Sequence, residues 1–174
     1  TWPTKRLETI TECLDSKRKP VTAAQRPSGN VPYFGANGQQ GWIDTAIFDE
    51  TLILVAEDGG HFDAPERGVA YKVSGPSWVN NHAHVLRPLP EVTAEYLHRS
   101  LKHFNFLPFI SGRTRAKLNK NQLNRVEIPV PPLKLQWDFD EKMAIVDQKM
   151  GNLGILVDEA NNLYNAELAR HFPS

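Results

Sequence analysis

Three polar segments of the chain, residues 33–41, 78–84 and 111–120, combine hydrogen-bonding side chains with a flexible backbone. Two are rich in amides, and the third carries cations among small residues. The residues that we expect to contact a ligand are Asn37, Gln39, Gln40, Lys72, Asn80, Asn81, His82, Arg113, Thr114, Arg115, Lys117, Asn119 and Lys120. Amides can bind adenine edges in the major groove of DNA, and Arg or Lys can bind guanine or phosphate. Each segment alone is also typical of a surface turn, but their co-occurrence favours a DNA-binding surface.

The sequence lacks the motifs of the reactions that often accompany DNA binding. Methyl transfer needs a glycine-rich turn and an Asn/Asp-Pro-Pro-aromatic loop, whereas Pro131-Pro132 is followed by Leu133. Neither a Walker lysine motif nor a nucleophile elbow occurs. We therefore predict a binding protein with no catalytic residues. The alternative is a small metal-dependent nuclease that uses Asp49, Glu57 and Asp58, although these acids lack the acid-x-Lys pattern of such sites.

Cysteine and histidine usage argues against a metal site. Cys13 is the single cysteine, which excludes an internal disulfide and a multi-cysteine metal site. It also predicts a reducing, cytoplasmic setting. His82 and His84 are one residue apart, and on a strand they would share a face. With no third ligand nearby, we expect an exposed polar strand face there, with no metal and no cofactor.

The formal net charge is zero, but the charges are unevenly distributed. Residues 1–132 hold 16 Lys and Arg against 13 Asp and Glu, while residues 133–174 hold 4 against 7. Five cations and no acid fall within residues 111–125, a local basic patch on a neutral chain. Indiscriminate binding to nucleic acid by overall charge is therefore excluded. No stretch approaches the roughly 18 apolar residues of a membrane span, and the start of the chain lacks the pattern of a signal peptide.

Residues 1–132 read as one mixed α/β globular domain. A short helix is expected near the N-terminus, where Leu7, Ile10 and Leu14 follow a helical spacing and Cys13 packs in the core. Glycine and proline punctuate residues 26–44, which predicts a loop. The other expected elements are strands at 51–56, 69–73 and 78–86, a helix that begins at Pro90 and buries Leu97, Leu101 and Phe104, and an edge strand at 126–130.

Residues 133–174 have a different pattern, that of a long helix. Apolar residues recur at alternating intervals of four and three, which is the heptad pattern of a coiled coil. We expect dimerisation through Phe139, Met143, Val146, Met150, Leu153, Val157, Ala160 and Tyr164. A helix over residues 134–171 would be about 57 Å long. Such a helix needs a partner helix to bury its apolar seam, unless it folds back on its own domain. The fold class is therefore α+β, a globular domain followed by a coiled-coil helix.

The order of these pieces resembles half of a type I restriction-modification specificity subunit. The matching residues are Trp2…Leu7, Val31-Pro32-Tyr33-Phe34-Gly35…Gly38…Gly41-Trp42-Ile43, Leu54-Val55-Ala56-Glu57-Asp58-Gly59 and the exit segment Gly112-x-Thr114-x-x-x-Leu118…Leu123-x-x-Val126-x-Ile128-Pro129-Val130-Pro131-Pro132-Leu133. The exit segment and the heptad helix after it are the most specific of these. One departure is Leu135-Gln136, where the family usually has Glu-Gln.

The resemblance implies a target-recognition domain at residues 1–132 that reads half of a split DNA site, and a spacer helix at 133–174. It implies double-stranded DNA, modification (methyltransferase) subunits and a restriction (motor-nuclease) subunit as partners. A complete subunit has two such domains and two helices. The chain is thus expected to be a half-subunit that pairs with a second copy of itself, or a fragment of a longer chain, which the absent initiator Met favours. The other alternative is a coiled-coil adaptor that does not touch DNA.

Overall fold

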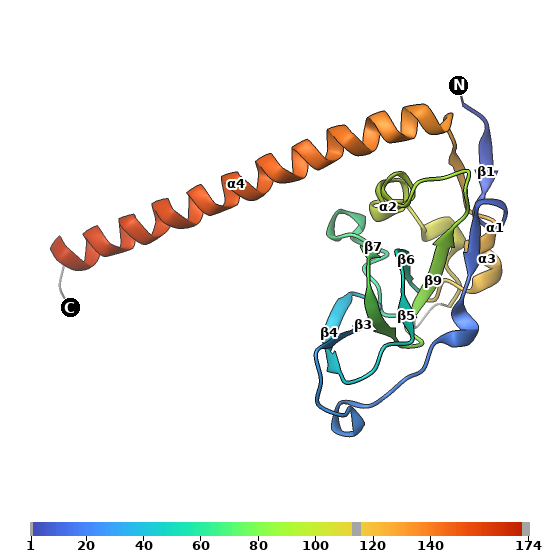
Figure 1. Ribbon diagram of the computed structural model, residues 1–174, viewed down its shortest axis with the longest axis horizontal. Coiled ribbons are helices and arrows are strands. Elements are labelled where there is room, and N and C mark those ends of the chain that lie inside the picture. Colours follow the sequence, from blue (N-terminus) through green and yellow to red (C-terminus); the bar gives the residue numbers. More distant parts are fainter. Residues whose placement is uncertain (1, 113–115, 172–174) are drawn as a thin grey trace. The chain divides into compact units, whose positions relative to one another are not determined.

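The computed structural model describes residues 2–112 and 116–171. The chain divides into two compact units, Thr1–Gln136 and Trp137–Ser174. The described strands of the first unit form three small sheets. Its elements combine strands with short helices, and one long helix follows, so the expected α+β class is confirmed (Figure 1). None of the described helices is long and apolar enough to cross a membrane.

The central sheet has the strand order β2-β9-β6-β7, with every pair antiparallel. Its strands are β2 (Thr11–Cys13), β6 (Leu52–Ala56), β7 (Ala70–Val73) and β9 (Ala83–Pro88). β6 is buried along its whole length because both of its faces are covered. Ile53 and Val55 belong to one apolar cluster, and Leu52 and Leu54 belong to another. Burial on both faces explains its continuous apolar run, and the strands predicted at 51–56 and 69–73 are confirmed.

A second sheet has the order β4-β3-β8-β5. It consists of β3 (Val31–Gly35), β4 (Gly38–Ile43), β5 (Phe48–Asp49) and β8 (Pro76–Val79). The loop predicted over residues 26–44 is wrong, because β3 and β4 form a hairpin with a bulge at Tyr33/Phe34. Its tight turn uses Gly38 at φ 100°, a conformation that favours glycine. The single strand predicted at 78–86 is also wrong, because a turn at Asn81 and His82 separates β8 from β9.

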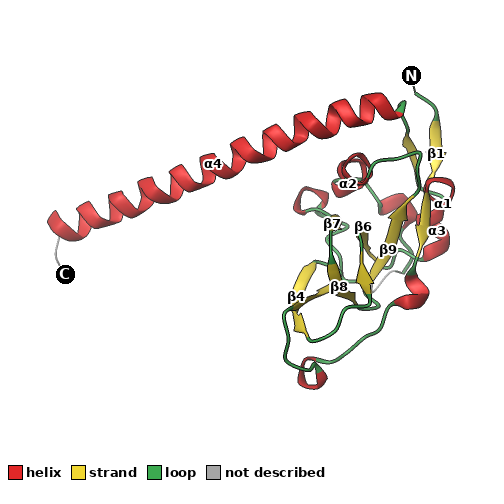
Figure 2. Ribbon diagram, in the orientation of Figure 1, coloured by secondary structure: helices red, strands yellow, loops and turns green. Residues whose placement is uncertain are grey.

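The helices of the first unit pack with one face of the central sheet, as Figure 2 shows for α1 to α3. They are α1 (Leu7–Ile10), α2 (Ala94–Lys102) and α3 (Lys120–Asn124), with short 3-10 turns at Asp15–Lys17 (η1), Ala23–Gln25 (η2), Pro65–Arg67 (η3) and Leu107–Phe109 (η4). The Thr93 side chain caps α2, so this helix begins later than predicted and ends before Phe104. Cys13 lies on β2, and not on the predicted helix.

β10 (Glu127–Pro129) pairs with β1 (Thr4–Arg6) in a two-stranded sheet, which confirms the predicted edge strand. The chain then enters α4 (Leu133–His171), and Gln136 fixes this entry. The Gln136 side chain is fully buried. Its Nε2 donates to the carbonyl oxygens of Pro131 (2.8 Å) and Glu91 (3.0 Å), and its Oε1 accepts from the amide of Thr93 (2.8 Å). The buried amide thus fastens the first turn of α4 to the segment before α2.

α4 is a continuous helix of 39 residues, which confirms the long helix predicted from the heptad pattern (Figure 1). From Val146 onwards its described large apolar side chains are exposed, and Met150 and Tyr164 are 63% and 64% accessible. Phe139 and Met143 are half-buried. Ile145, Ile155, Leu156 and Leu163 are exposed outside the predicted seam. An apolar surface of this extent is typical of a helix that binds another helix.

Candidate nucleic-acid interface

The parallel pairing of β3 with β8 brings two of the predicted polar segments together. Tyr33 is opposite Trp78 and Phe34 is opposite Val79 in this pairing. The strands end side by side, and the amide of Asn80 donates to the carbonyl of Phe34 (3.0 Å). A hollow of about 500 Å³ opens there, which we call the polar cleft. Its polar lining residues are Thr22, Gln25, Arg26, Tyr33, Gln40, Asn80, Asn81 and His82.

The amide side chains of the polar cleft differ in their exposure to solvent. Asn80 is only 4% exposed. Its Nδ2 donates to Oε1 of Gln40 (3.2 Å), and its Oδ1 accepts from the amide of His82 (2.8 Å). Asn80 is therefore held inside the turn, whereas Gln39, Gln40 and Asn81 are exposed. The exposed amides are the ones able to meet base edges.

Arg26 is a cation of the polar cleft that the sequence did not single out. Its guanidinium stacks on the ring of Tyr33, 3.9 Å from the centroid. Nε donates to the carbonyl of Val21 and Nη1 to that of Gln40, both at 3.3 Å. Stacking and hydrogen bonds fix the planar guanidinium in a partly exposed position, which is how Arg is arranged for bidentate recognition. The sequence signal that could have identified Arg26 was its position at the edge of a glycine- and proline-rich segment.

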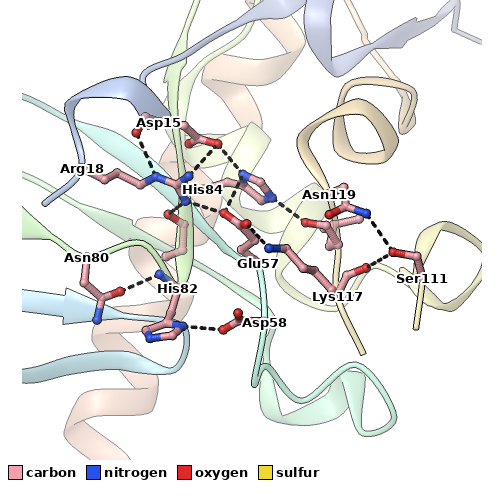
Figure 3. A network of polar contacts seen from close by, with 12 residues as sticks. Asp15, Arg18, Glu57, Asp58, Asn80, His82, His84, Ser111, Lys117 and Asn119 are labelled. Carbon is pink, nitrogen blue, oxygen red and sulfur yellow. Dashed lines mark hydrogen bonds and ion pairs between the residues drawn. The ribbon is translucent and has the colours of Figure 1, made fainter. Parts of the chain in front are cut away.

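A network of charged side chains lies next to Asn80 and His82, two residues of the polar cleft, as Figure 3 shows. Glu57 follows β6 and accepts hydrogen bonds from Nη1 of Arg18 (2.6 Å). Its other oxygen is paired with Nζ of Lys117 (3.0 Å). Burial alone would raise the pKa of Glu57, but the hydrogen bonds from Arg18 and Lys117 and the nearby charges outweigh it and lower that pKa. Lys117, predicted to contact DNA, is therefore also committed to an ion pair within the protein.

His84 and Asp15 form the buried end of this network. His84 is 1% exposed on β9, with Nδ1 at 2.6 Å from Oδ2 of Asp15 and Nε2 at 2.7 Å from the carbonyl of Leu118. Oδ1 of Asp15 accepts from the amide of Val85 (2.9 Å). Burial would raise the pKa of Asp15, yet its partners, His84 first among them, hold that pKa below its usual value. The network joins η1, β6, β9 and the chain before α3.

The exposed polar strand face predicted for His82 and His84 is wrong. His84 is buried, and the His82 side chain lies in a turn and contacts Asp58. In the described part of the chain, Cys13, Asp15 and His84 have ligand atoms within 4.8 Å of one another. Both nitrogens of His84 and both oxygens of Asp15 already have protein partners. Burial raises the pKa of the Cys13 thiol, which opposes the thiolate that a metal would need. This donor set does not fit a metal ion.

Hydrogen bonds hold both ends of the cationic segment, residues 111–120. Ser111 and Lys117 exchange backbone hydrogen bonds of 2.9 Å, and the amide of Leu118 donates to the carbonyl of Glu57 (2.8 Å). Nδ2 of Asn119 donates to Oγ of Ser111 (2.8 Å). Lys120 is exposed at the start of α3. The predicted contacts Arg113, Thr114 and Arg115 lie outside the described residues.

Two further predicted residues, Asn37 in the turn of the β3–β4 hairpin and Lys72, are not among those that line the polar cleft. Asn37 is exposed in its turn, and Nδ2 donates to the carbonyl of Gly59 (2.9 Å). Lys72 on β7 is exposed and pairs with Glu95 of α2. The acids of the nuclease alternative do not form a site, because Glu57 and Asp58 have basic partners and Asp49 is exposed on β5.

Residues 1–150 match the protein family described as type I restriction modification DNA specificity domain. The chain belongs to this family. The family match confirms the resemblance to a type I restriction-modification specificity subunit that the sequence predicted. A putative type I restriction enzyme specificity subunit of Haemophilus influenzae, S.HindORF215P, is 36% identical over 135 residues. The match covers 78% of this chain and 34% of that protein, so the chain spans about a third of the length of this curated relative.

The specificity domain also shares its fold with solved structures. The type I restriction-modification S subunit from M. genitalium is similar with a TM-score of 0.73 and 16% identity, over 98% of this chain and 45% of that one. The HsdS subunit from Thermoanaerobacter tengcongensis is similar with a TM-score of 0.55 and 18% identity, over 87% and 39% of the two chains. The arrangement of a mixed domain followed by a long helix is therefore that of specificity subunits.

Proposed function

We propose that this chain reads one half of a bipartite DNA site for a type I restriction-modification complex and itself catalyses no reaction. The observation that carries the proposal is the polar cleft, where exposed amides from two distant segments meet the oriented guanidinium of Arg26. Membership of a DNA specificity family supports DNA as the ligand, and it gives no support to the nuclease and adaptor alternatives.

Binding combines base contacts with phosphate contacts. The exposed amides Gln40 and Asn81, together with Arg26, are suited to base edges, each good contact contributing about 1–3 kcal/mol of discrimination. Lys120 and the cations of residues 113–117 are suited to phosphates. Because residues 1–132 carry only a small excess of positive charge, a single domain binds weakly and loses affinity as salt rises.

α4 acts as a spacer that pairs with a second helix, from another copy of the chain or from the other half of a longer chain. Its exposed apolar surface supports this role. Methyltransferase subunits dock on the assembly and supply the methyl-transfer chemistry, and a motor-nuclease subunit is a further partner. The complex works in the cytoplasm, and the chain needs no cofactor of its own.

Selection of duplexes from a randomised library by the full chain, with and without its methyltransferase, tests DNA reading directly. We expect enrichment of a short motif, which becomes a split site when two domains are joined.

Replacing Arg113, Arg115 and Lys117 with Ala should weaken retention of DNA and make its salt dependence shallower. An adaptor would show neither enrichment nor this loss. Plasmid cleavage in Mg²⁺ that disappears in Glu57→Ala would establish the nuclease instead.

A further inference from the structure

A second hollow, of about 430 Å³, lies in the first unit between the β3–β4 turn, η3, β7 and α2. We call it the basic pocket. Its polar and charged lining residues are Asn37, His61, Arg67, Lys72, His98 and Lys102, together with the phenol of Tyr71. No Asp or Glu is among the described residues that line it. η3 and β7, which are neighbours in the sequence, and the more distant α2 thus bring cations to one concave surface.

Two of these cations have no counter-charge among the residues that the structure describes. Lys72 is paired with Glu95, which also binds Arg99. Arg67 and Lys102, by contrast, form no ion pair with any carboxylate in the described ranges 2–112 and 116–171. Positive charge that is gathered in a hollow without a compensating acid attracts an anion.

A side chain that lines the pocket, His98, also has a hydrogen-bonding atom without a partner among the described residues. Nδ1 of His98 is buried and has no hydrogen-bond partner among the described residues. Burial lowers the pKa of His98, so its ring is neutral near pH 7. Buried polar atoms in proteins normally have partners, so the His98 ring beside the pocket is incompletely satisfied by the described residues.

The basic pocket and the polar cleft flank the same hairpin. Asn37 and Gly38 line the basic pocket, while Gln40, two residues further on, lines the polar cleft. A side chain at Gly38 would meet no atom within 4 Å, so the turn is open to a ligand. A duplex whose bases contact the polar cleft would carry its sugar-phosphate backbone past this turn.

We propose, resting on the function proposed above, that the basic pocket binds a phosphate group of the DNA backbone through Arg67 and Lys102. Such a contact positions the duplex and carries no sequence information. It would add affinity for any duplex, while the amides of the polar cleft select the sequence.

The test measures binding of the full chain to a fluorescent 30-bp duplex of random sequence by anisotropy, between about 50 and 200 mM KCl. The variants are Arg67→Gln, Lys102→Gln and the double variant. The matched control is Lys5→Gln, which removes the same charge from β1, away from the pocket lining. Each lost phosphate contact should reduce the slope of log affinity against log salt by about 0.9. The double variant should therefore lose about 1.8 in slope, and Lys5→Gln should keep the wild-type slope.

A second measurement separates the failure of this site from the failure of DNA reading. On the duplex selected by the wild-type chain, the double variant should bind more weakly but prefer that sequence over a scrambled duplex by the wild-type ratio. If the double variant matches Lys5→Gln in slope and affinity while the wild type still discriminates, the pocket assignment is wrong and DNA reading stands. If the wild-type chain binds neither duplex, both proposals are wrong. A change in the preference ratio would also overturn the assignment, because a phosphate contact cannot produce it.

Discussion

At the level of single residues, the guanidinium of Arg26 is oriented by contacts with other groups of the chain. The Tyr33 ring and two backbone carbonyls orient its guanidinium beside Gln40. A cation that needs no reordering on binding loses little conformational entropy when it meets DNA. Its side chain is therefore the most informative position at which to test base recognition.

Arg26→Ala is expected to lower the affinity for the selected duplex about tenfold and to reduce its preference over a scrambled duplex, since one base contact is worth about 1–3 kcal/mol. Arg26→Lys should recover little, because an ammonium cannot make the planar contacts. Anisotropy titration measures both quantities. Arg87→Ala is the matched control, because Arg87 is paired with Glu12 and Glu50 and does not line the polar cleft. Equal losses in Arg26→Ala and Arg87→Ala would contradict a specific role for Arg26.

The Asp15–His84 contact is a structural feature of the fold. Asp15→Asn removes the carboxylate beside His84 and Arg18, and we expect it to lower the free energy of unfolding by about 2–4 kcal/mol, since the remaining buried groups lose their partner. Urea denaturation measures the change. Glu12→Gln removes a carboxylate from an exposed ion pair with Arg87 and should cost less than about 1 kcal/mol. A loss in Asp15→Asn no greater than this would show that the network contributes little.

The same network predicts how stability depends on pH. The pKa values of Asp15 and Glu57 are lowered below 3.8 and 4.5 by folding, because hydrogen bonds and cations stabilise the carboxylates. Their contribution is therefore complete above those ordinary values and is lost as the pH falls through the lowered ones. We expect the contribution of these two carboxylates to be level from pH 7 to about 5 and to fall on further acidification. The double variant Asp15→Asn/Glu57→Gln should show a shallower fall in urea titrations. The slope should not vanish, because the pKa of Glu95 is lowered as well.

At the level of elements, local patterns were sufficient wherever one segment determines its own structure. β6 and α4 were predictable because continuous apolar residues and a heptad repeat are visible in a short window. The β3–β4 hairpin was missed because its glycines and prolines are also typical of a loop. The separation of β8 from β9 was missed because β8 pairs with β3, which is far away in the sequence. The amide segments were found from composition, but Arg26 and the basic pocket arise only when distant elements meet.

Gly151 and Gly154 weaken α4 by a predictable amount. Both lie in the helix, and a methyl group at either position would meet no atom within 4 Å. Gly154→Ala should therefore stabilise the helix by up to about 1 kcal/mol, because Ala loses less backbone entropy and has the higher helix propensity. An increase in the melting temperature followed by circular dichroism at 222 nm would show it. A decrease would indicate that the glycine is needed for close approach of a partner helix.

The seam of α4 predicts how the chain associates. Replacing Met143, Met150 and Val157 with Asp should abolish self-association, or binding to a partner chain, because three charges would be buried between apolar helices. The globular unit should stay folded, since its core residues are unchanged. Light scattering measures the mass. The control variant carries Asp at Gln148, Asn152 and Asn162, which adds the same charge away from the seam. An unchanged mass in the seam variant, alone and with the methyltransferase, would contradict the coiled-coil role.

At the level of the whole molecule, the proposed DNA binding depends on both charge and geometry. Residues 1–132 carry the positive excess, and residues 133–174 carry a matching negative excess. The helical part therefore adds no general attraction to DNA, and a single chain has few phosphate contacts to offer. In the proposed function, affinity comes from joining two domains, because the second domain then binds at a high effective concentration.

A duplex that carries two inverted copies of the selected half-site should therefore bind the paired chain about a hundredfold more tightly than a duplex with one copy. This gain should peak at one spacing of the half-sites, since a helix of 39 residues is about 58 Å long and rigid. The seam variant at Met143, Met150 and Val157 should bind both duplexes with the single-site affinity, and the Gln148, Asn152 and Asn162 variant should keep the gain. Gel-shift titrations over a series of spacings measure each case. Equal affinity of the paired chain for one and two half-sites at every spacing would show that α4 does not set the distance between two readers.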